Sequence, residues 1–262
     1  MDNGDGTYTI TLSVQGYTEE DTETTELPAD IVLVVDTSNS MDTRVGRRQC
    51  GGTQFSPVRY GLLEGYECDS CEEFYWNNPG TCTKMIDINR LDVAKAAASE
   101  FVGGLLDTGT DVKIGLYDFS YVNSSTNISL TNDRDILMNG IENIDLPDSY
   151  YDGGTDYDVG LRGAEDILNQ GDSDRQKFIV FLSDGQPDAG SGGVSYANRL
   201  KENGVTIFSV GIDTGSSGNA ANALKNIASE DANRNKYFYA ASSDGSSGDA
   251  LTYILDQIRK TI

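Results

Sequence analysis

The sequence predicts an α/β protein with a doubly wound, mostly parallel central sheet and helices on both faces. Short, continuous apolar runs alternate along the chain with stretches whose apolar residues recur at helical spacing. The apolar runs lack the polar alternation of a sheet with one wet face, which indicates parallel strands covered on both sides. The length of 262 residues is enough for one large α/β domain or two small ones.

Five apolar runs are expected to form the parallel strands, and a shorter run near residues 128–130 is expected to form an antiparallel edge strand. The five runs are residues 30–36, 111–118, 176–183, 205–212 and 236–241. Residues 7–15 alternate polar and apolar side chains, which indicates a half-buried strand, and an acidic, Thr-rich linker follows at 19–26. We therefore divide the chain into an N-terminal strand and linker, residues 1–28, and one domain, residues 29–262.

Helices are expected between the strands. Apolar residues fall on one helical face in residues 91–105, 161–168 and 251–262. Weaker helical patterns occupy residues 133–144, 193–203 and 218–229.

Residues 42–90 do not fit this alternation. They carry all four cysteines and six aromatic residues, and they separate the first strand from its helix by far more than the usual ~2–6 residues. We interpret them as an inserted subdomain beside the ligand-binding end of the sheet. Within it, Phe74-Tyr75-Trp76 is expected to form a small core, with stacking on a ligand as the alternative.

Charge excludes several classes of partner. Lys and Arg total 19 against 42 Asp and Glu, a formal net charge of -23, which disfavours nucleic acids and anionic membranes. No apolar run approaches the ~18 residues that would span a membrane. The chain contains no histidine, which removes the commonest general base and most zinc chemistry.

Oxygen-bearing side chains gather where strands end. Asp36, Ser38 and Ser40 follow the first strand, Thr155 follows two glycines, and Asp184 follows the strand at 176–183. Ligands bind at the carboxyl ends of such strands, and hard divalent cations prefer oxygen ligands. These residues therefore predict a metal site, although helix capping by Asp36 and Ser38 is an alternative.

The three motifs D-x-S-x-S, G-G-T and S-D-G, in this order, resemble the metal-ion-dependent adhesion site of von Willebrand factor type A domains. The resemblance covers residues 29–262, apart from the insert. It implies that Asp36, Ser38, Ser40, Thr155 and Asp184 hold Mg²⁺, or Mn²⁺ or Ca²⁺, and that a carboxylate of a protein partner completes the coordination. It also implies a binding module and not an enzyme.

Cys50, Cys68, Cys71 and Cys82 lie within the insert. Four cysteines in a loop-rich segment predict two disulfides, with the pairing open, and an oxidising compartment. A zinc site and free buried thiols are the alternatives.

Residues 5–12 resemble the strand that precedes A domains in wall-anchored surface proteins and pilus-tip adhesins of Gram-positive bacteria. The resemblance implies a monomeric, extracellular fragment of a longer cell-wall or pilus-tip protein that binds a host matrix or cell-surface protein. An intracellular A domain docking on an ATPase and a metal-assisted hydrolase are alternatives, and free thiols would favour the intracellular one. We also expect residues 42–90 to wall one side of the metal site and to set partner specificity.

Overall fold

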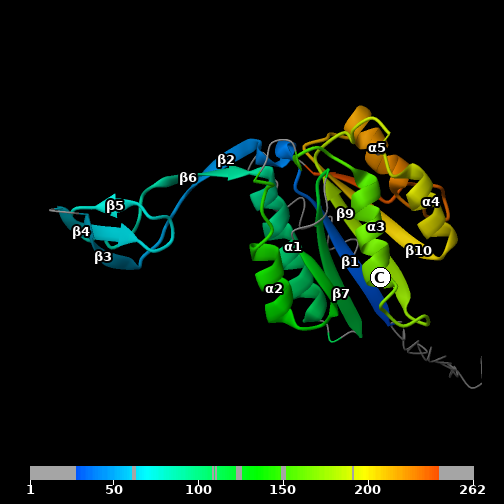
Figure 1. Cartoon of the computed structure of the whole chain (residues 1–262), viewed down its shortest axis with the longest axis horizontal. Coiled ribbons are helices and arrows are strands. Elements are labelled where there is room, and N and C mark those ends of the chain that lie inside the picture. The colour runs from blue at the N-terminus through cyan, green and yellow to red at the C-terminus, as the bar shows by residue number, and fades with distance from the viewer. Residues whose placement is uncertain are drawn as a thin grey trace, which may run out of the picture.

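The computed structural model describes residues 28–60, 63–107, 109, 111–121, 126–148, 152–190 and 192–241. Its main sheet comprises β1 (Ala29–Asp36), β7 (Val112–Phe119), β8 (Asn127–Thr131), β9 (Gln176–Ser183), β10 (Val205–Ile212) and β11 (Phe238–Ala241). The strand order is β11-β10-β9-β1-β7-β8, and every pairing is parallel except that of the edge strand β8 with β7. The predicted fold class is thus confirmed, including the antiparallel edge strand (Figure 1).

Five helices follow the predicted pattern. They are α1 (Arg90–Leu106), α2 (Arg134–Glu142), α3 (Tyr157–Leu168), α4 (Val194–Glu202) and α5 (Asn219–Ile227). Helix α3 begins earlier than its apolar stripe, because the Asp156 side chain accepts a hydrogen bond from the Asp158 N–H and caps the first turn. The strand expected at 7–15, the linker at 19–26 and the helix at 251–262 lie outside the described residues.

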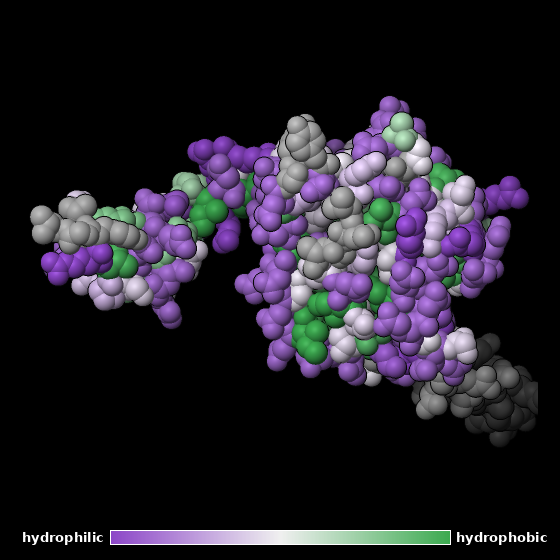
Figure 2. Space-filling model, viewed as in Figure 1, coloured by the Kyte–Doolittle hydropathy of each residue, from purple (hydrophilic) through white to green (hydrophobic). Residues whose placement is uncertain are grey.

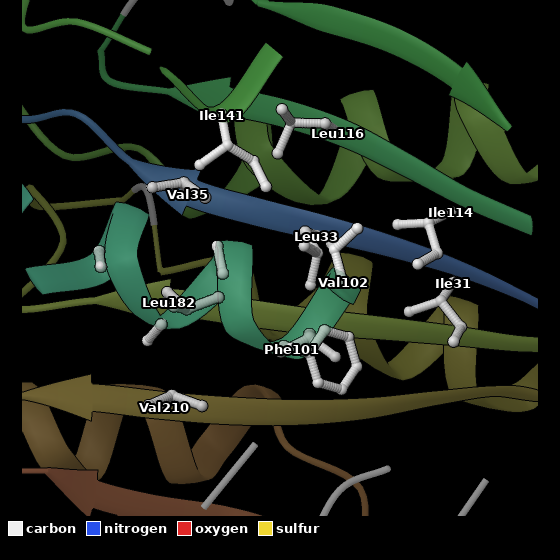
Figure 3. Close-up of a cluster of buried hydrophobic side chains, with 14 of the residues drawn as sticks. Ile31, Leu33, Val35, Phe101, Val102, Ile114, Leu116, Ile141, Leu182 and Val210 are labelled. Atoms are coloured by element: carbon white, nitrogen blue, oxygen red, sulfur yellow. The ribbon is translucent and has the colours of Figure 1, made fainter. Parts of the chain in front are cut away.

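Strand β1 is the centre of the core. Its residues Ile31, Leu33 and Val35 pack with α1 and α2 on one face of the sheet (Figure 3). Its residues Val32 and Val34 pack with α3, α4 and α5 on the other face. Every residue of β1 is buried, as expected for a strand covered on both sides.

A buried ion pair closes the end of the sheet where β1 begins. The Arg175 guanidinium donates to Asp30 Oδ1 at 2.6 Å and to Asp111 Oδ2 at 2.8 Å. The Asp30 side chain is fully buried and its Oδ2 has no hydrogen-bond partner. Removing the arginine would therefore leave a buried charge unpaired.

The insert leaves the domain as an arm with a small lobe at its far end (Figures 1 and 2). The arm is the antiparallel pair β2 (Arg44–Gln49) and β6 (Met85–Asn89). The lobe is a separate antiparallel sheet of β3 (Phe55–Tyr60), β4 (Leu63–Cys68) and β5 (Phe74–Tyr75). The expectation that the insert walls one side of the metal site is wrong for the lobe, because the two-stranded arm carries it away from the sheet.

Candidate metal centre

The end of β1 and the loop after it form the first part of the candidate site. The Ser38 N–H donates to Asp36 Oδ1 at 2.7 Å, which turns the chain directly after the strand. The Ser38 and Ser40 hydroxyl oxygens are 3.0 Å apart. Ser38 precedes the short 3₁₀ helix η1 (Asn39–Asp42), but its side chain makes no capping hydrogen bond. The structure does not show the helix cap considered as the alternative.

Strand β9 lies beside β1 and supplies the second part. At its end, the Ser183 hydroxyl donates to Asp36 Oδ2 at 2.5 Å. The Ser40 hydroxyl donates to Asp184 Oδ1 at 2.7 Å. Four of the five predicted residues, Asp36, Ser38, Ser40 and Asp184, are thus joined by short polar contacts at the carboxyl ends of two neighbouring strands.

Thr155, in the loop that precedes α3, lies beside the same cluster. The Asn39 N–H donates to the Gly153 carbonyl at 2.8 Å and ties this loop to the one after β1. A Cβ atom on Gly153 would lie 2.1 Å from Asn39 Oδ1, so a larger residue here would displace the Asn39 side chain. A Cβ on Gly185 would lie 3.3 Å from Ser40 Oγ and 3.5 Å from Thr155 Oγ1, which places both hydroxyls beside one point.

A surface pocket of about 470 Å³ opens over these loops. Its lining includes Ser40, Thr155, Gly185, Gln186 and Asp188. Asp36 and Ser38 are buried beneath the loops, while Ser40 is partly exposed. Of the five side chains, Ser40 is therefore the one nearest the solvent.

The electrostatics of this cluster favour a cation. Complete burial, and then repulsion by Asp184, raise the pKa of Asp36 to about 7, although hydrogen bonds from Ser183 and Ser38 partly oppose this shift. A buried carboxyl group next to a second one is costly to ionise without a positive charge nearby.

Arg90, the first residue of α1, supplies one such charge. Its Nη1 donates to Asp184 Oδ2 at 2.6 Å and its Nε donates to Asp213 Oδ2 at 3.2 Å. Nothing in the sequence marks Arg90 as part of the site, because it lies 94 positions from Asp184 and belongs to no motif.

Two further residues that the sequence analysis did not select support the loops. The Thr155 N–H donates to Asp188 Oδ2 at 3.2 Å, and the Tyr157 hydroxyl donates to the Gly185 carbonyl at 2.8 Å. Asp188 lies four residues after Asp184, where a polar residue in a loop gives no distinctive signal. Tyr157 is fully buried against Phe119 and Phe181 and has the pattern of a core residue.

The donors suit a hard divalent cation. Two carboxylates and three hydroxyls are oxygen ligands of the kind that Mg²⁺, Mn²⁺ and Ca²⁺ prefer. A side chain at Gly153 would push against Asn39, and a Cβ at Gly185 would make a close contact with the Ser40 hydroxyl. The residues present therefore fit such an ion.

The cysteines differ from the prediction. Cys50, Cys68, Cys71 and Cys82 are all free, so neither of the two predicted disulfides is present in the structure. The closest sulfur pairs, Cys71–Cys82 at 3.4 Å and Cys50–Cys68 at 3.7 Å, are well beyond the ~2.05 Å of a disulfide bond. Instead, all four sulfur atoms lie within 4.8 Å of one another.

Comparison with known protein families identifies the family of this chain. The model of the von Willebrand factor type A domain matches residues 83–257, about two thirds of the sequence. The chain therefore belongs to this family. The matched segment begins near the end of the insert and leaves out β1 and its loop. A comparison with curated protein sequences gives no match.

Solved structures show the same fold. The vWF domain of the type V pili tip protein Mfa5 from Porphyromonas gingivalis has a TM-score of 0.60 at 17% identity, over 90% of this chain and 95% of that one. Proximal thread matrix protein 1 from the mussel byssus has a TM-score of 0.58 at 20% identity, over 89% of this chain. The pilus adhesin SpaC from Lactobacillus rhamnosus GG has a TM-score of 0.56 at 17% identity, over 90% of this chain. The chain spans 48% of the mussel protein and 30% of SpaC.

Among the described helices, none combines the length and apolar character needed to cross a bilayer.

Proposed function

We propose that this chain is a protein-binding module whose contact with its partner depends on a divalent cation. Asp36, Ser38, Ser40, Thr155 and Asp184 would hold Mg²⁺, or Mn²⁺ or Ca²⁺. The observation that carries this proposal is the convergence of these five oxygen-bearing side chains, from three separate loops, beneath one surface pocket. A mussel thread matrix protein structure with the same fold is described as having a zinc-occupied MIDAS motif, which supports a metal at this place in the fold.

The bound ion would supply an electrophilic centre for a carboxylate of the partner. This chain's part is to keep that centre positive and open. Three of its five ligands would be neutral hydroxyls, and Arg90 already neutralises part of the charge of Asp184. The pocket above Ser40 and Thr155 leaves room for an Asp or Glu side chain of another protein.

Binding rather than catalysis is the function that these residues support. The sequence has no histidine, and the described polar cluster offers carboxylates and hydroxyls that bond to one another. We propose an extracellular site of action, at a bacterial cell wall or pilus tip, with a host matrix or cell-surface protein as partner. The similarity in fold to two pilus-tip or pilus adhesin structures supports this location.

The four free cysteines favour a second candidate, an intracellular A domain that docks on a protein partner. Reduced thiols are typical of the cytosol. Limited proteolysis of intact source cells separates the two candidates. Release of peptides from this domain supports the surface location, and complete protection supports the intracellular one.

The metal proposal is tested by calorimetry with Mg²⁺ and Mn²⁺ on the whole chain. Asp36→Ala should abolish the binding heat while circular dichroism shows a retained fold. Thr37→Val is the matched control, because the Thr37 hydroxyl donates to the Phe119 carbonyl and not to the cluster. In the variant, the N–H of residue 37 still donates to the Phe119 carbonyl, so the control should bind metal normally. Wild-type metal affinity in Asp36→Ala would refute the site.

Partner binding is then measured against a panel of extracellular-matrix proteins, with and without Mg²⁺. A Mg²⁺-dependent interaction that Asp36→Ala abolishes and Thr37→Val retains would support adhesion. Binding that is equal in both variants and independent of Mg²⁺ would contradict it.

A further inference from the structure

The lobe and arm of the insert have almost no hydrophobic core. Among the side chains described in residues 42–90, only Cys68 and Cys82 are buried. Phe74 and Tyr75 are half-buried and Trp76 is 64% exposed, so the small aromatic core expected from the sequence is incomplete. A module of this size without a core needs a cross-link or a metal to hold its fold.

The four cysteines meet at one point inside this module. Their sulfur atoms all lie within 4.8 Å of one another. The two closest pairs are 3.4 Å and 3.7 Å apart. Four thiolates around one tetrahedral zinc ion at ~2.3 Å would be about 3.8 Å apart. The sulfur cluster therefore has the size of a single-metal site.

The backbone brings the thiols together from three segments. Cys68 and Cys71 lie on one tight turn, where the N–H groups of Cys71 and Glu72 both donate to the Cys68 carbonyl. Glu72 has a φ of 56°, the left-handed conformation that closes this turn. A Cβ on Gly52 would lie 2.8 Å from Cys68 Sγ, so the chain approaches this sulfur closely only because residue 52 is glycine.

The other two thiols come from the junction of arm and lobe. The Cys50 N–H donates to the Lys84 carbonyl at 2.8 Å, and the Cys82 N–H donates to the Gly52 carbonyl at 2.7 Å. These bonds hold the segments that carry Cys50 and Cys82 side by side. The cluster thus joins the base of the lobe to the end of the arm.

A polar contact from outside the cluster is suited to a thiolate at Cys82. The Tyr75 hydroxyl accepts the Thr83 N–H at 3.2 Å and lies 3.2 Å from Cys82 Sγ. With one lone pair engaged by Thr83, its own hydrogen is free to point at the sulfur. Such bonds to ligand sulfurs orient them and tune their affinity for metal.

We propose that Cys50, Cys68, Cys71 and Cys82 bind one structural Zn²⁺ that folds the insert. Four sulfur ligands in a tetrahedral arrangement favour zinc, whereas the oxygen ligands at the edge of the sheet favour a hard cation. On binding, each thiol releases its proton to solvent and the four thiolates give the site a net charge of about -2. Lys84, whose Nζ donates to the Cys71 carbonyl at 3.3 Å, lies beside this charge. This site is separate from the proposed adhesion site and does not depend on it.

The experiment measures metal content of the whole chain, produced with both zinc and iron available. We expect elemental mass spectrometry to find one zinc ion per chain. Cys50→Ser and Cys71→Ser should each lose it. Ser70→Ala, a change in the same turn that removes no thiol, should keep it, and so should Asp36→Ala. Replacement with Co²⁺ should give the absorption bands of a tetrahedral thiolate site. Tyr75→Phe should lower zinc affinity about tenfold.

The only tryptophan of the chain reports on the insert by itself. Trp76 stacks edge-to-face on Phe74, next to Tyr75. Removing zinc with a chelator should therefore change Trp76 fluorescence, while far-UV circular dichroism keeps the signal of the main domain.

Three results would overturn the proposal. One is a chain without zinc whose mass under non-reducing conditions is lower by four hydrogens, which means two disulfides. The second is iron in place of zinc. The third is undiminished zinc in the Cys→Ser variants.

Discussion

Asp36→Asn should make the metal-free domain more stable at neutral pH, and the size of the effect follows from the burial of this carboxyl group. Its pKa is raised from 3.8 to about 7 in the folded state. A carboxyl group with a raised folded-state pKa contributes stability below its unfolded-state pKa of 3.8 and loses it as the pH rises to about 7. Each unit of pKa difference corresponds to ~1.4 kcal/mol of unfolding free energy. Asparagine does not titrate, so the variant escapes this loss.

The assay is urea unfolding of both proteins, followed by circular dichroism in buffer freed of Mg²⁺, Mn²⁺ and Ca²⁺. The isoelectric point near 4.1 favours precipitation at lower pH, so the comparison runs from about pH 5 to about pH 8. The loss of stability runs over about two pH units, from the start of this range to the folded-state pKa of about 7. Between the two ends of the range, the variant should therefore gain about 3 kcal/mol of unfolding free energy relative to the wild type.

The change between the two pH values is the quantity of interest, because it cancels any constant cost of altering the hydrogen bonds to Ser38 and Ser183. Saturating Mg²⁺ should stabilise the wild type and leave the variant unchanged. If the difference between the two proteins stayed constant within about 1 kcal/mol across the pH range, the reasoning on Asp36 would be refuted.

Three further predictions concern the surroundings of the site. Arg90→Gln leaves the buried Asp184 without its cation, so the unfolding free energy without metal should fall by about 3 kcal/mol. Calorimetry should show tighter Mg²⁺ binding in this variant because a competing positive charge is gone, and weaker binding would contradict the prediction. Arg175→Met strands the buried Asp30 at the other end of β1, which should cost about 3–5 kcal/mol in urea unfolding without any change in Mg²⁺ affinity. Replacing residues 43–88 with a short Gly/Ser loop should preserve the thermal stability and Mg²⁺ binding of the domain, since Asp42 Oδ1 and Asn89 Nδ2 are already 3.2 Å apart. Loss of Mg²⁺ binding in the trimmed chain would show that the insert supports the metal site, and loss of partner binding alone would assign specificity to the insert.

The sheet and its site loops could be predicted from the sequence because their signals are local. Continuous apolar runs mark buried parallel strands, and the carboxyl ends of such strands meet at one edge. The order of Asp36, Thr155 and Asp184 along the chain therefore predicted that they would meet, and the structure brings them together. The glycines at 153 and 185 belong to the same local motifs, although the side chains that they contact appear only in three dimensions.

The tertiary structure alone decided three other features. Arg90 meets Asp184 across 94 positions, because the insert returns to the sheet at the start of α1, and no pattern announces such a pairing. The arm carries the lobe away from the site, since paired strands β2 and β6 project as a ribbon, whereas the length of a segment says nothing of its direction. Four cysteines in a small insert are compatible by spacing with two disulfides or with one metal. Only the folded chain shows that four sulfur atoms from three segments converge on one point, which is the arrangement that the proposed zinc site requires.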